Sequence, residues 1–162
     1  MPMHVDAARI KLVVLDVDGT LTDGGIYILE NGEQFKKFNA KDGLGVRRAV
    51  KHGYIVGIIS HSMASGAIVK RAQMMGVDKC YVGDADKLEV LHDWCRELDL
   101  QLDQVAYIGD DINDLAIIAA VGLSACPADA MPAVQQACAV VLTRKGGEGC
   151  VREFLDRFLP TC

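Results

Sequence analysis

The sequence predicts a three-layer α/β domain in which helices cover both faces of a parallel β-sheet. Short runs rich in β-branched residues alternate along the chain with longer segments of helical apolar spacing, which is the pattern of repeated βαβ units. The apolar runs are continuous rather than alternating, as expected of strands that are covered on both faces. We therefore expect a Rossmann-like sheet, with one β-hairpin inserted after its first strand.

The first expected strand is the apolar run 10–15, and five more strands follow it. They are 55–59, 79–82, 105–108, 123–126 and 140–142. The helical segments are 42–52, 65–75, 87–98, 113–120, 131–137 and 149–159. Because a helix separates most consecutive strands, the connections favour parallel pairing.

Residues 24–38 depart from this rhythm and predict the inserted hairpin. Asn31-Gly32 lies between two short apolar runs, and Asn-Gly is typical of a tight turn because both residues tolerate a positive φ. An isolated two-stranded ribbon is marginally stable in water. This one carries four large apolar side chains, Tyr27, Leu29, Phe35 and Phe38. We expect it to pack against another subunit; the alternative is that it folds back onto its own domain.

Length and composition allow one domain, residues 1–162, without a second substrate domain. The net charge of −5 and the scattered Lys and Arg residues argue against nucleic acid or an anionic membrane as partner. Every apolar run is shorter than the roughly 20 residues of a membrane span. Residues 1–9 carry no apolar core of a signal peptide, so we expect a cytoplasmic protein.

The six cysteines are expected to be reduced, mostly buried thiols. No two lie within four positions of one another, and no histidine spacing completes a zinc site. The residues concerned are Cys80, Cys95, Cys126, Cys138, Cys150 and Cys162.

Two carboxylates follow the first strand, one residue apart. Side chains alternate along a strand, and the chain turns at Gly19, so Asp16 and Asp18 are expected to converge beyond the strand's carboxyl end. Ligands of open α/β sheets bind at this edge. Two carboxylates held close together require a compensating cation.

A second acidic cluster follows the strand 105–108. Asp110, Asp111 and Asp114 lie within five positions at the start of a helix, and such a density of charge favours a bound divalent cation. Helix capping would explain Asp111 or Asp114. Capping does not explain the cluster together with the Asp16 and Asp18 pair, so the two clusters predict one metal-dependent phosphoryl site.

Two further polar residues occupy suggestive positions. Ser60 follows the strand 55–59 and could donate a hydrogen bond to a phosphate oxygen, although a serine there also serves as a turn or helix cap. Lys87 opens a helix, where its charge opposes the helix dipole. From the residues alone, Lys87 can be interpreted either as a functional residue or as a solvated one.

The motifs at 16–20, Ser60, Lys87 and 109–111 resemble the four motifs of the haloacid dehalogenase superfamily. More closely, nearly the whole chain resembles the small, capless 3-deoxy-D-manno-octulosonate 8-phosphate phosphatases and their relatives acting on nine-carbon sialic-acid-type 9-phosphates. The segments that carry this likeness are 21–25, 36–43, 83–88, 128–130 and 146–153.

The resemblance implies a role for each motif. Asp16 would attack phosphorus to form an aspartyl-phosphate, and Asp18 would act as general acid and then general base. Mg²⁺ would be held by Asp16, the main-chain carbonyl of Asp18 and Asp110. The remaining implied residues are Ser60 and Lys87 in the phosphoryl cradle, Gly19 and Thr20 at the substrate, and Asp111 and Asp114 as supports of the metal ligands.

The resemblance also implies a homotetramer in which the hairpin builds the interface and neighbouring subunits cover each other's active sites. Arg71 would reach a neighbour's site and meet the substrate carboxylate. The chain departs from the family where His61 follows Ser60 in place of Gly-Arg, so His61 either contacts the substrate or is a loop residue. It also ends at residue 162 without the glycine-containing tail of many octulosonate enzymes.

The implied substrate is a phosphorylated sugar acid, foremost 3-deoxy-D-manno-octulosonate 8-phosphate. A nine-carbon sialic-type 9-phosphate is the first alternative. A catalytically silent oligomerisation module is the second, and the presence of every catalytic carboxylate argues against it.

Overall fold

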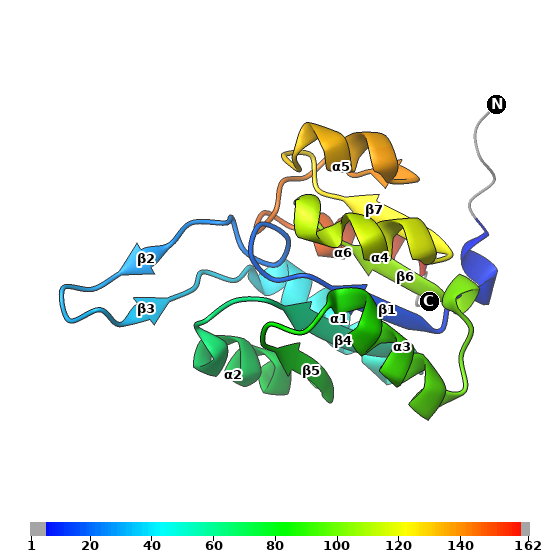
Figure 1. Cartoon of the computed structure of the whole chain (residues 1–162), viewed down its shortest axis with the longest axis horizontal. Helices are drawn as coiled ribbons and strands as arrows, with labels where there is room; N and C mark the ends of the chain where they lie inside the picture. Colours follow the sequence, from blue (N-terminus) through cyan, green and yellow to red (C-terminus); the bar gives the residue numbers. More distant parts are fainter. Residues whose placement is uncertain (1–5, 160–162) are drawn as a thin grey trace.

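The computed structural model describes residues 6–159 and shows one six-stranded parallel sheet (Figure 1). Its order is β5-β4-β1-β6-β7-β8. The strands are β1 Leu12–Leu15, β4 Ile55–Ser60, β5 Lys79–Val82, β6 Val105–Ile108, β7 Leu123–Cys126 and β8 Val140–Val141. The predicted α/β sheet is thereby confirmed. Residues 1–5 and 160–162, with the expectations for the two termini and for Cys162, lie outside the described part.

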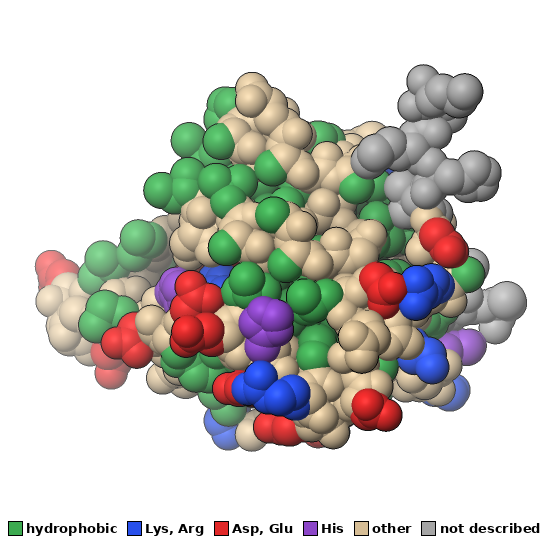
Figure 2. Space-filling model, turned by 45° about the vertical axis from the view of Figure 1, so that its right-hand side comes forward, with side chains coloured by type: hydrophobic (Ala, Val, Ile, Leu, Met, Phe, Trp, Pro, Cys, Tyr) green, Lys and Arg blue, Asp and Glu red, His purple; other side chains and the backbone are tan. Residues whose placement is uncertain are grey.

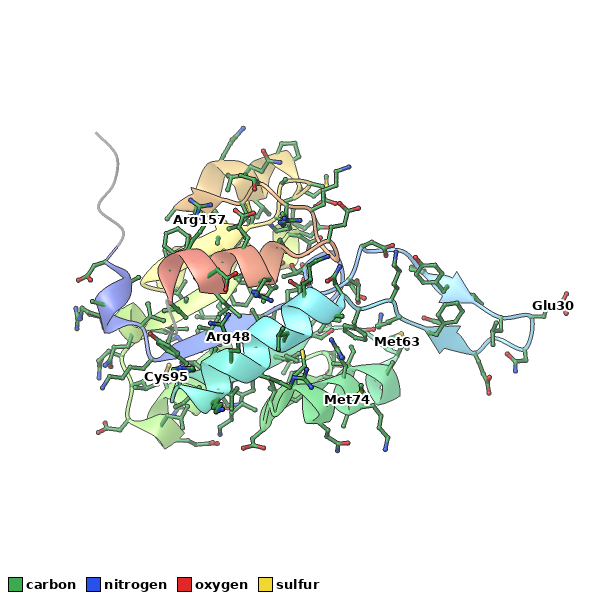
Figure 3. The ribbon with its side chains drawn as sticks, turned by 180° about the vertical axis from the view of Figure 1, so that it is seen from behind. Glu30, Arg48, Met63, Met74, Cys95 and Arg157 are labelled. Carbon is green, nitrogen blue, oxygen red and sulfur yellow. The ribbon has the colours of Figure 1, made fainter. Side chains whose placement is uncertain are left out.

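Helices cover both faces of the sheet. They are α1 Ala40–Lys51, α2 Ser65–Met75, α3 Lys87–Leu98, α4 Leu115–Ala120, α5 Pro132–Ala137 and α6 Cys150–Phe158, with 3₁₀ turns η1 Ala7–Arg9, η2 Leu102–Gln104 and η3 Ile112–Asp114. One apolar cluster packs α1, α2 and α6 on one face, and a second packs α3, α4 and α5 on the other. Figure 3 shows α1 and α6 side by side over the sheet.

The continuous apolar run of β1 reflects this double covering. Val13 and Leu15 point into the first cluster, whereas Leu12 and Val14 point into the second. All four side chains are fully buried. Burial of each such side chain stabilises the fold by about 1.5–3 kcal/mol, so this strand anchors the residues that follow it.

Most helix ends lie within one or two residues of the predictions, and at two helix starts polar side chains that cap the backbone explain the difference. The helix α1 begins at Ala40 rather than residue 42, since the Asn39 side chain accepts a hydrogen bond from the Lys41 N–H at 2.8 Å. The segment expected as one helix from residue 113 begins as the turn η3. There the Asp111 carboxylate accepts from the Ile112 N–H at 2.7 Å.

The predicted hairpin is present as β2 Tyr27–Ile28 and β3 Gln34–Phe35 and projects away from the sheet (Figure 1). The expectation that both turn residues adopt a positive φ is wrong for Asn31. Among the hairpin's residues 27–35 only Gly32 has a positive φ, of 87°. The Gly32 N–H donates to the Leu29 carbonyl at 2.9 Å. This geometry fits a type I turn followed by a left-handed glycine.

The distribution of charges on the described surface and the free state of the cysteines agree with what the composition predicts. Figure 2 shows acidic and basic side chains interspersed over the lower half of the face in view, whereas hydrophobic and uncharged side chains cover the upper half. The five cysteines in residues 6–159 are free. Among the helices of this part, none combines the length and the hydropathy that a membrane crossing requires.

Candidate active site

Three neighbouring strands bring their carboxyl ends to one edge of the sheet. The register pairs Leu15 of β1 with Ile58 of β4 and with Ile108 of β6, and the Asp16 N–H donates to the Ile108 carbonyl at 3.0 Å. The residues that follow these strands therefore meet. They line a cavity of about 260 Å³ formed by Asp16, Asp18, Ser60, His61, Ser62, Asp110, Asp111 and Asn113.

Gly19 lets the two acidic loops approach each other. Its φ is 85°, and a Cβ placed on it would lie 1.9 Å from Oδ2 of Asp110. Any other residue would carry this clash and an unfavourable backbone conformation together. The glycine after Asp18 is thus required for the contact between the two acidic clusters.

Asp114 anchors the second acidic loop from beneath. Its carboxylate is fully buried and accepts from Lys87 Nζ at 2.7 Å and from the Tyr107 hydroxyl. It also accepts from the N–H groups of Asp110 at 2.9 Å and Asp111 at 3.2 Å. Because four donors occupy its oxygens, Asp114 orients the loop rather than offering a free ligand atom to the cavity.

Lys87 is buried, so the interpretation of a solvated lysine is wrong. Its ammonium donates to Oδ1 of Asp16 at 2.9 Å as well as to Asp114. Burial lowers the pKa of Lys87, but the charges of Asp16 and Asp114 raise it more, so the net shift is upward. Lys87 therefore stays charged and fixes the position of the Asp16 carboxylate.

Asp16 and Asp110 face each other as like charges. Burial and the charge of Asp114 raise the pKa of Asp16 to about 6, against the lowering effect of Lys87. Burial, followed by the hydrogen bond and charge of Asp16, raises the pKa of Asp110 to about 9. Raised pKa values on both groups are typical of two carboxylates held closer together than two anions tolerate.

These carboxylates suit a hard cation. One oxygen each of Asp16, Asp110 and Asp114 lies within 4.8 Å of the others. Since Asp114 is occupied by its donors, Asp16 and Asp110 are the carboxylates left to bind a metal. An all-oxygen donor set beside a water-accessible cavity is what Mg²⁺ prefers.

Ser60 and His61 line the same cavity from the end of β4. The Ser60 hydroxyl is buried and accepts from the Ser62 N–H at 3.1 Å. Nε2 of His61 lies 2.7 Å from the Ala85 carbonyl; because a carbonyl only accepts, Nε2 carries the proton. This contact ties the loop after β4 to the loop before α3.

Besides Lys87 and Asp114, which lie beneath it, three more predicted site residues lie outside the lining of this cavity. Gly19 forms the turn described above, and Thr20 is fully buried, with no partner for its hydroxyl among residues 6–159. Arg71 donates to the Asn39 carbonyl at 3.3 Å and lies 5.7 Å from the Phe38 ring centroid. The structure therefore does not bring Arg71 to the cavity of its own chain, and its reach to a neighbour stays a prediction.

Sequence reasoning missed Lys36 and Tyr107. Lys36 Nζ lies 2.6 Å from Oδ1 of Asp18, and nothing in the adjacent pair Lys36-Lys37 indicates which lysine turns inward. Tyr107 supports Asp114. A hydroxyl within the otherwise apolar strand β6 was the one signal that could have found it.

Comparison with known proteins agrees with this geometry. Residues 51–155 match the family described as haloacid dehalogenase-like hydrolase. The chain is 42% identical over 153 residues to the 3-deoxy-D-manno-octulosonate 8-phosphate phosphatase KdsC of Yersinia pestis, covering 94% of this chain and 81% of that protein.

Solved structures show the same fold. The phosphatase of this name from Moraxella catarrhalis, in complex with magnesium ion, phosphate ion and KDO, matches with a TM-score of 0.91 and 32% identity, over 96% of this chain and 88% of that one. The cobalt-bound form of the Haemophilus influenzae phosphatase matches with a TM-score of 0.90 and 35% identity, over 96% and 90%. The chain thus belongs to the haloacid dehalogenase-like hydrolases, within the 3-deoxy-D-manno-octulosonate 8-phosphate phosphatase family, and is a phosphoric monoester hydrolase.

Proposed function

We propose that this protein is a Mg²⁺-dependent phosphatase that hydrolyses 3-deoxy-D-manno-octulosonate 8-phosphate to the free sugar acid and phosphate. The observation that carries the proposal is the cavity in which Asp16, Asp18 and Asp110 meet, with Lys87 fixing Asp16 from behind. The substrate rests on the relatives, one of which has magnesium, phosphate and KDO bound together.

Asp16, Asp110 and the main-chain carbonyl of Asp18 are the residues that would hold Mg²⁺. When bound, the cation offsets the repulsion between the Asp16 carboxylate and the phosphate dianion. The fit is supported by the close approach of the Asp16 and Asp110 carboxylates, because a bound cation would counteract the burial and the repulsion that raise their pKa values.

Asp16 acts as the nucleophile through an oxygen that faces the cavity. In the first step an Asp16 oxygen–phosphorus bond forms, the phosphorus–sugar oxygen bond breaks, and Asp18 gives a proton to the departing sugar oxygen. In the second step water attacks phosphorus, its proton goes to Asp18, and the bond to Asp16 breaks. The net reaction consumes one water.

The remaining residues hold the phosphoryl group and the sugar. Ser60 donates to a phosphate oxygen, and Lys87 supplies positive charge through its contact with Asp16. Gly19 and Thr20 shape the loop around the phosphate, and His61, which lines the same cavity, would contact the sugar.

We also propose a homotetramer assembled through the hairpin. The side chains of Ile26 and Ile28 are 76% and 62% exposed, an apolar surface on a ribbon that leaves the sheet (Figure 1). Packing against neighbours would bury it and cover the open cavity. Arg71 would then serve a neighbour's site.

The test is phosphate release from synthetic 3-deoxy-D-manno-octulosonate 8-phosphate with Mg²⁺. We expect turnover that EDTA abolishes, and Asp16→Asn to be inactive while its circular dichroism spectrum is unchanged. The exposed Asp93→Asn is the matched control. Faster turnover of a nine-carbon 9-phosphate would show that this compound is the substrate instead. A wild-type protein without activity would refute the proposal.

A further inference from the structure

The carboxylate of Asp18 is held from outside its own loop. Its side chain is 45% exposed at the cavity, and Oδ1 accepts from Lys36 Nζ at 2.6 Å. A half-exposed aspartate on a turn rotates freely unless a partner fixes it. The partner here comes from the hairpin, eighteen residues further along the chain.

The side chain of Lys36 is largely buried in this contact. Its side chain is only 9% exposed, whereas the neighbouring Lys37 is exposed. A buried ammonium requires a partner, and Asp18 supplies it. The bridge between Thr22 and Phe38 fixes the base of the hairpin against the Asp18 loop. Both ends of the ion pair are therefore held by backbone structure.

The contact leaves one oxygen of Asp18 for chemistry. With Oδ1 engaged by Lys36, Oδ2 is the atom available to take a proton from water. A fixed orientation within hydrogen-bond reach is the first requirement of a general base.

We propose that Lys36 is a positioning residue that fixes Asp18 for the hydrolysis of the aspartyl-phosphate, so that the hairpin serves catalysis as well as assembly. This inference rests on the proposed function. It assigns the hairpin a contribution to the active site of its own subunit.

The test uses p-nitrophenyl phosphate with Mg²⁺, because p-nitrophenolate departs without a proton from Asp18. The first step then needs no help from Asp18, whereas the second step does. For Lys36→Met we expect kcat to fall about 10-fold or more, within the range of acid–base catalysis. The value of kcat/KM should stay within about 3-fold, because it reports the steps up to phenolate release.

Rapid mixing should show one equivalent of p-nitrophenolate released per subunit of Lys36→Met before a slow steady state. Lys36→Arg should restore most of kcat, and Lys37→Met should behave as the wild-type protein. Light scattering on every variant checks that the oligomeric state is unchanged.

A parallel loss of kcat and kcat/KM would overturn the proposal, since a distorted hairpin would lower both. Unchanged kinetics would also overturn it, as would a loss of kcat/KM alone, which would make Lys36 a substrate-binding residue. A wild-type protein that hydrolysed neither p-nitrophenyl phosphate nor 3-deoxy-D-manno-octulosonate 8-phosphate would refute the proposed function, and this role with it.

Discussion

At the scale of single residues, the site is organised by buried charges rather than by exposed ones. Lys87 and Asp114 form an ion pair beneath the cavity, and Tyr107 donates to the same carboxylate. Such pairs contribute little net stability, because desolvation offsets their attraction. Their effect is orientation: the network fixes Asp16 and the loop of Asp110 before any substrate binds.

Another buried carboxylate lies away from the cavity. Asp42 of α1 is 1% exposed and accepts from the Arg152 N–H at 2.9 Å, in the first turn of α6. Burial raises its pKa to about 6, against the lowering effects of this hydrogen bond and of the charge of Arg71. Asp42 therefore joins two helices at the cost of a desolvated charge.

This pKa predicts a dependence of stability on pH. Between its unfolded value near 3.8 and its folded value of about 6, the folded state holds more protons. The contribution of Asp42 to the free energy of unfolding therefore falls as pH rises through this window and is constant above it. Over two pH units the change amounts to about 3 kcal/mol.

For Asp42→Asn we expect urea denaturation in EDTA to show a variant whose stability relative to wild type rises between pH 4 and pH 6. The asparagine keeps an oxygen that can accept from Arg152. The exposed Asp93→Asn is the control, for which the difference from wild type should change little. A difference for Asp42→Asn that is constant across pH would contradict the assignment.

At the scale of elements, the loop between β8 and α6 packs directly on the nucleophile loop. A Cβ on Gly146 would lie 1.8 Å from the Gly19 carbonyl oxygen, and the Gly147 N–H donates to the Thr20 carbonyl at 3.1 Å. The two loops touch backbone to backbone, so the position of Asp16 depends on a segment near the other end of the chain.

Gly146→Ala should therefore displace the nucleophile loop. We expect the free energy of unfolding to fall by about 1–3 kcal/mol, because the added methyl group overpacks the contact. We expect the rate of phosphate release to fall about 100-fold, because displacements of reacting groups near 1 Å have that effect. Gly66→Ala in α2 is the matched control. It has nothing within 4 Å of the added Cβ and should be neutral or slightly stabilising. Full activity of Gly146→Ala would contradict the dependence.

At the scale of the whole molecule, the open cavity and the projecting hairpin are related through the proposed tetramer. The cavity lies at the carboxyl edge of the sheet, and the hairpin leaves the sheet from the loop after β1 (Figure 1). In the proposed tetramer the apolar faces of the hairpins meet. Burying an isoleucine there would contribute about 1.5–3 kcal/mol in each subunit.

Replacement of Ile28 by lysine tests this assembly. We expect Ile28→Lys to sediment as smaller species than the wild-type tetramer in analytical ultracentrifugation, and to lose activity on the sugar phosphate because its cavity is uncovered. Val141→Lys, on the sheet-edge strand β8 and 44% exposed in the wild type, should remain tetrameric. A monomeric wild-type protein, or a tetrameric Ile28→Lys, would refute the interface.

The sequence by itself determined the sheet, its strands and the edge at which Asp16 and Asp110 meet. This was possible because apolar periodicity and the parallel order of βαβ units are local properties, and parallel strands align their carboxyl ends. The likeness of its motifs to a known family indicated the reaction. Helix ends shifted by a residue or two, where capping side chains such as Asn39 decided the boundary.

Only the tertiary structure decided which charged residues are partners. Lys87 reaches Asp16 across 71 positions, and Lys36 rather than Lys37 turns toward Asp18. Asp42 accepts from the main-chain N–H of Arg152 across 110 positions. Spacing along the chain carries no information on such pairs, because they depend on strand register and on how each helix packs. The order of the residues therefore indicates the type of reaction, whereas the packing of the folded chain sets how the reacting groups are aligned.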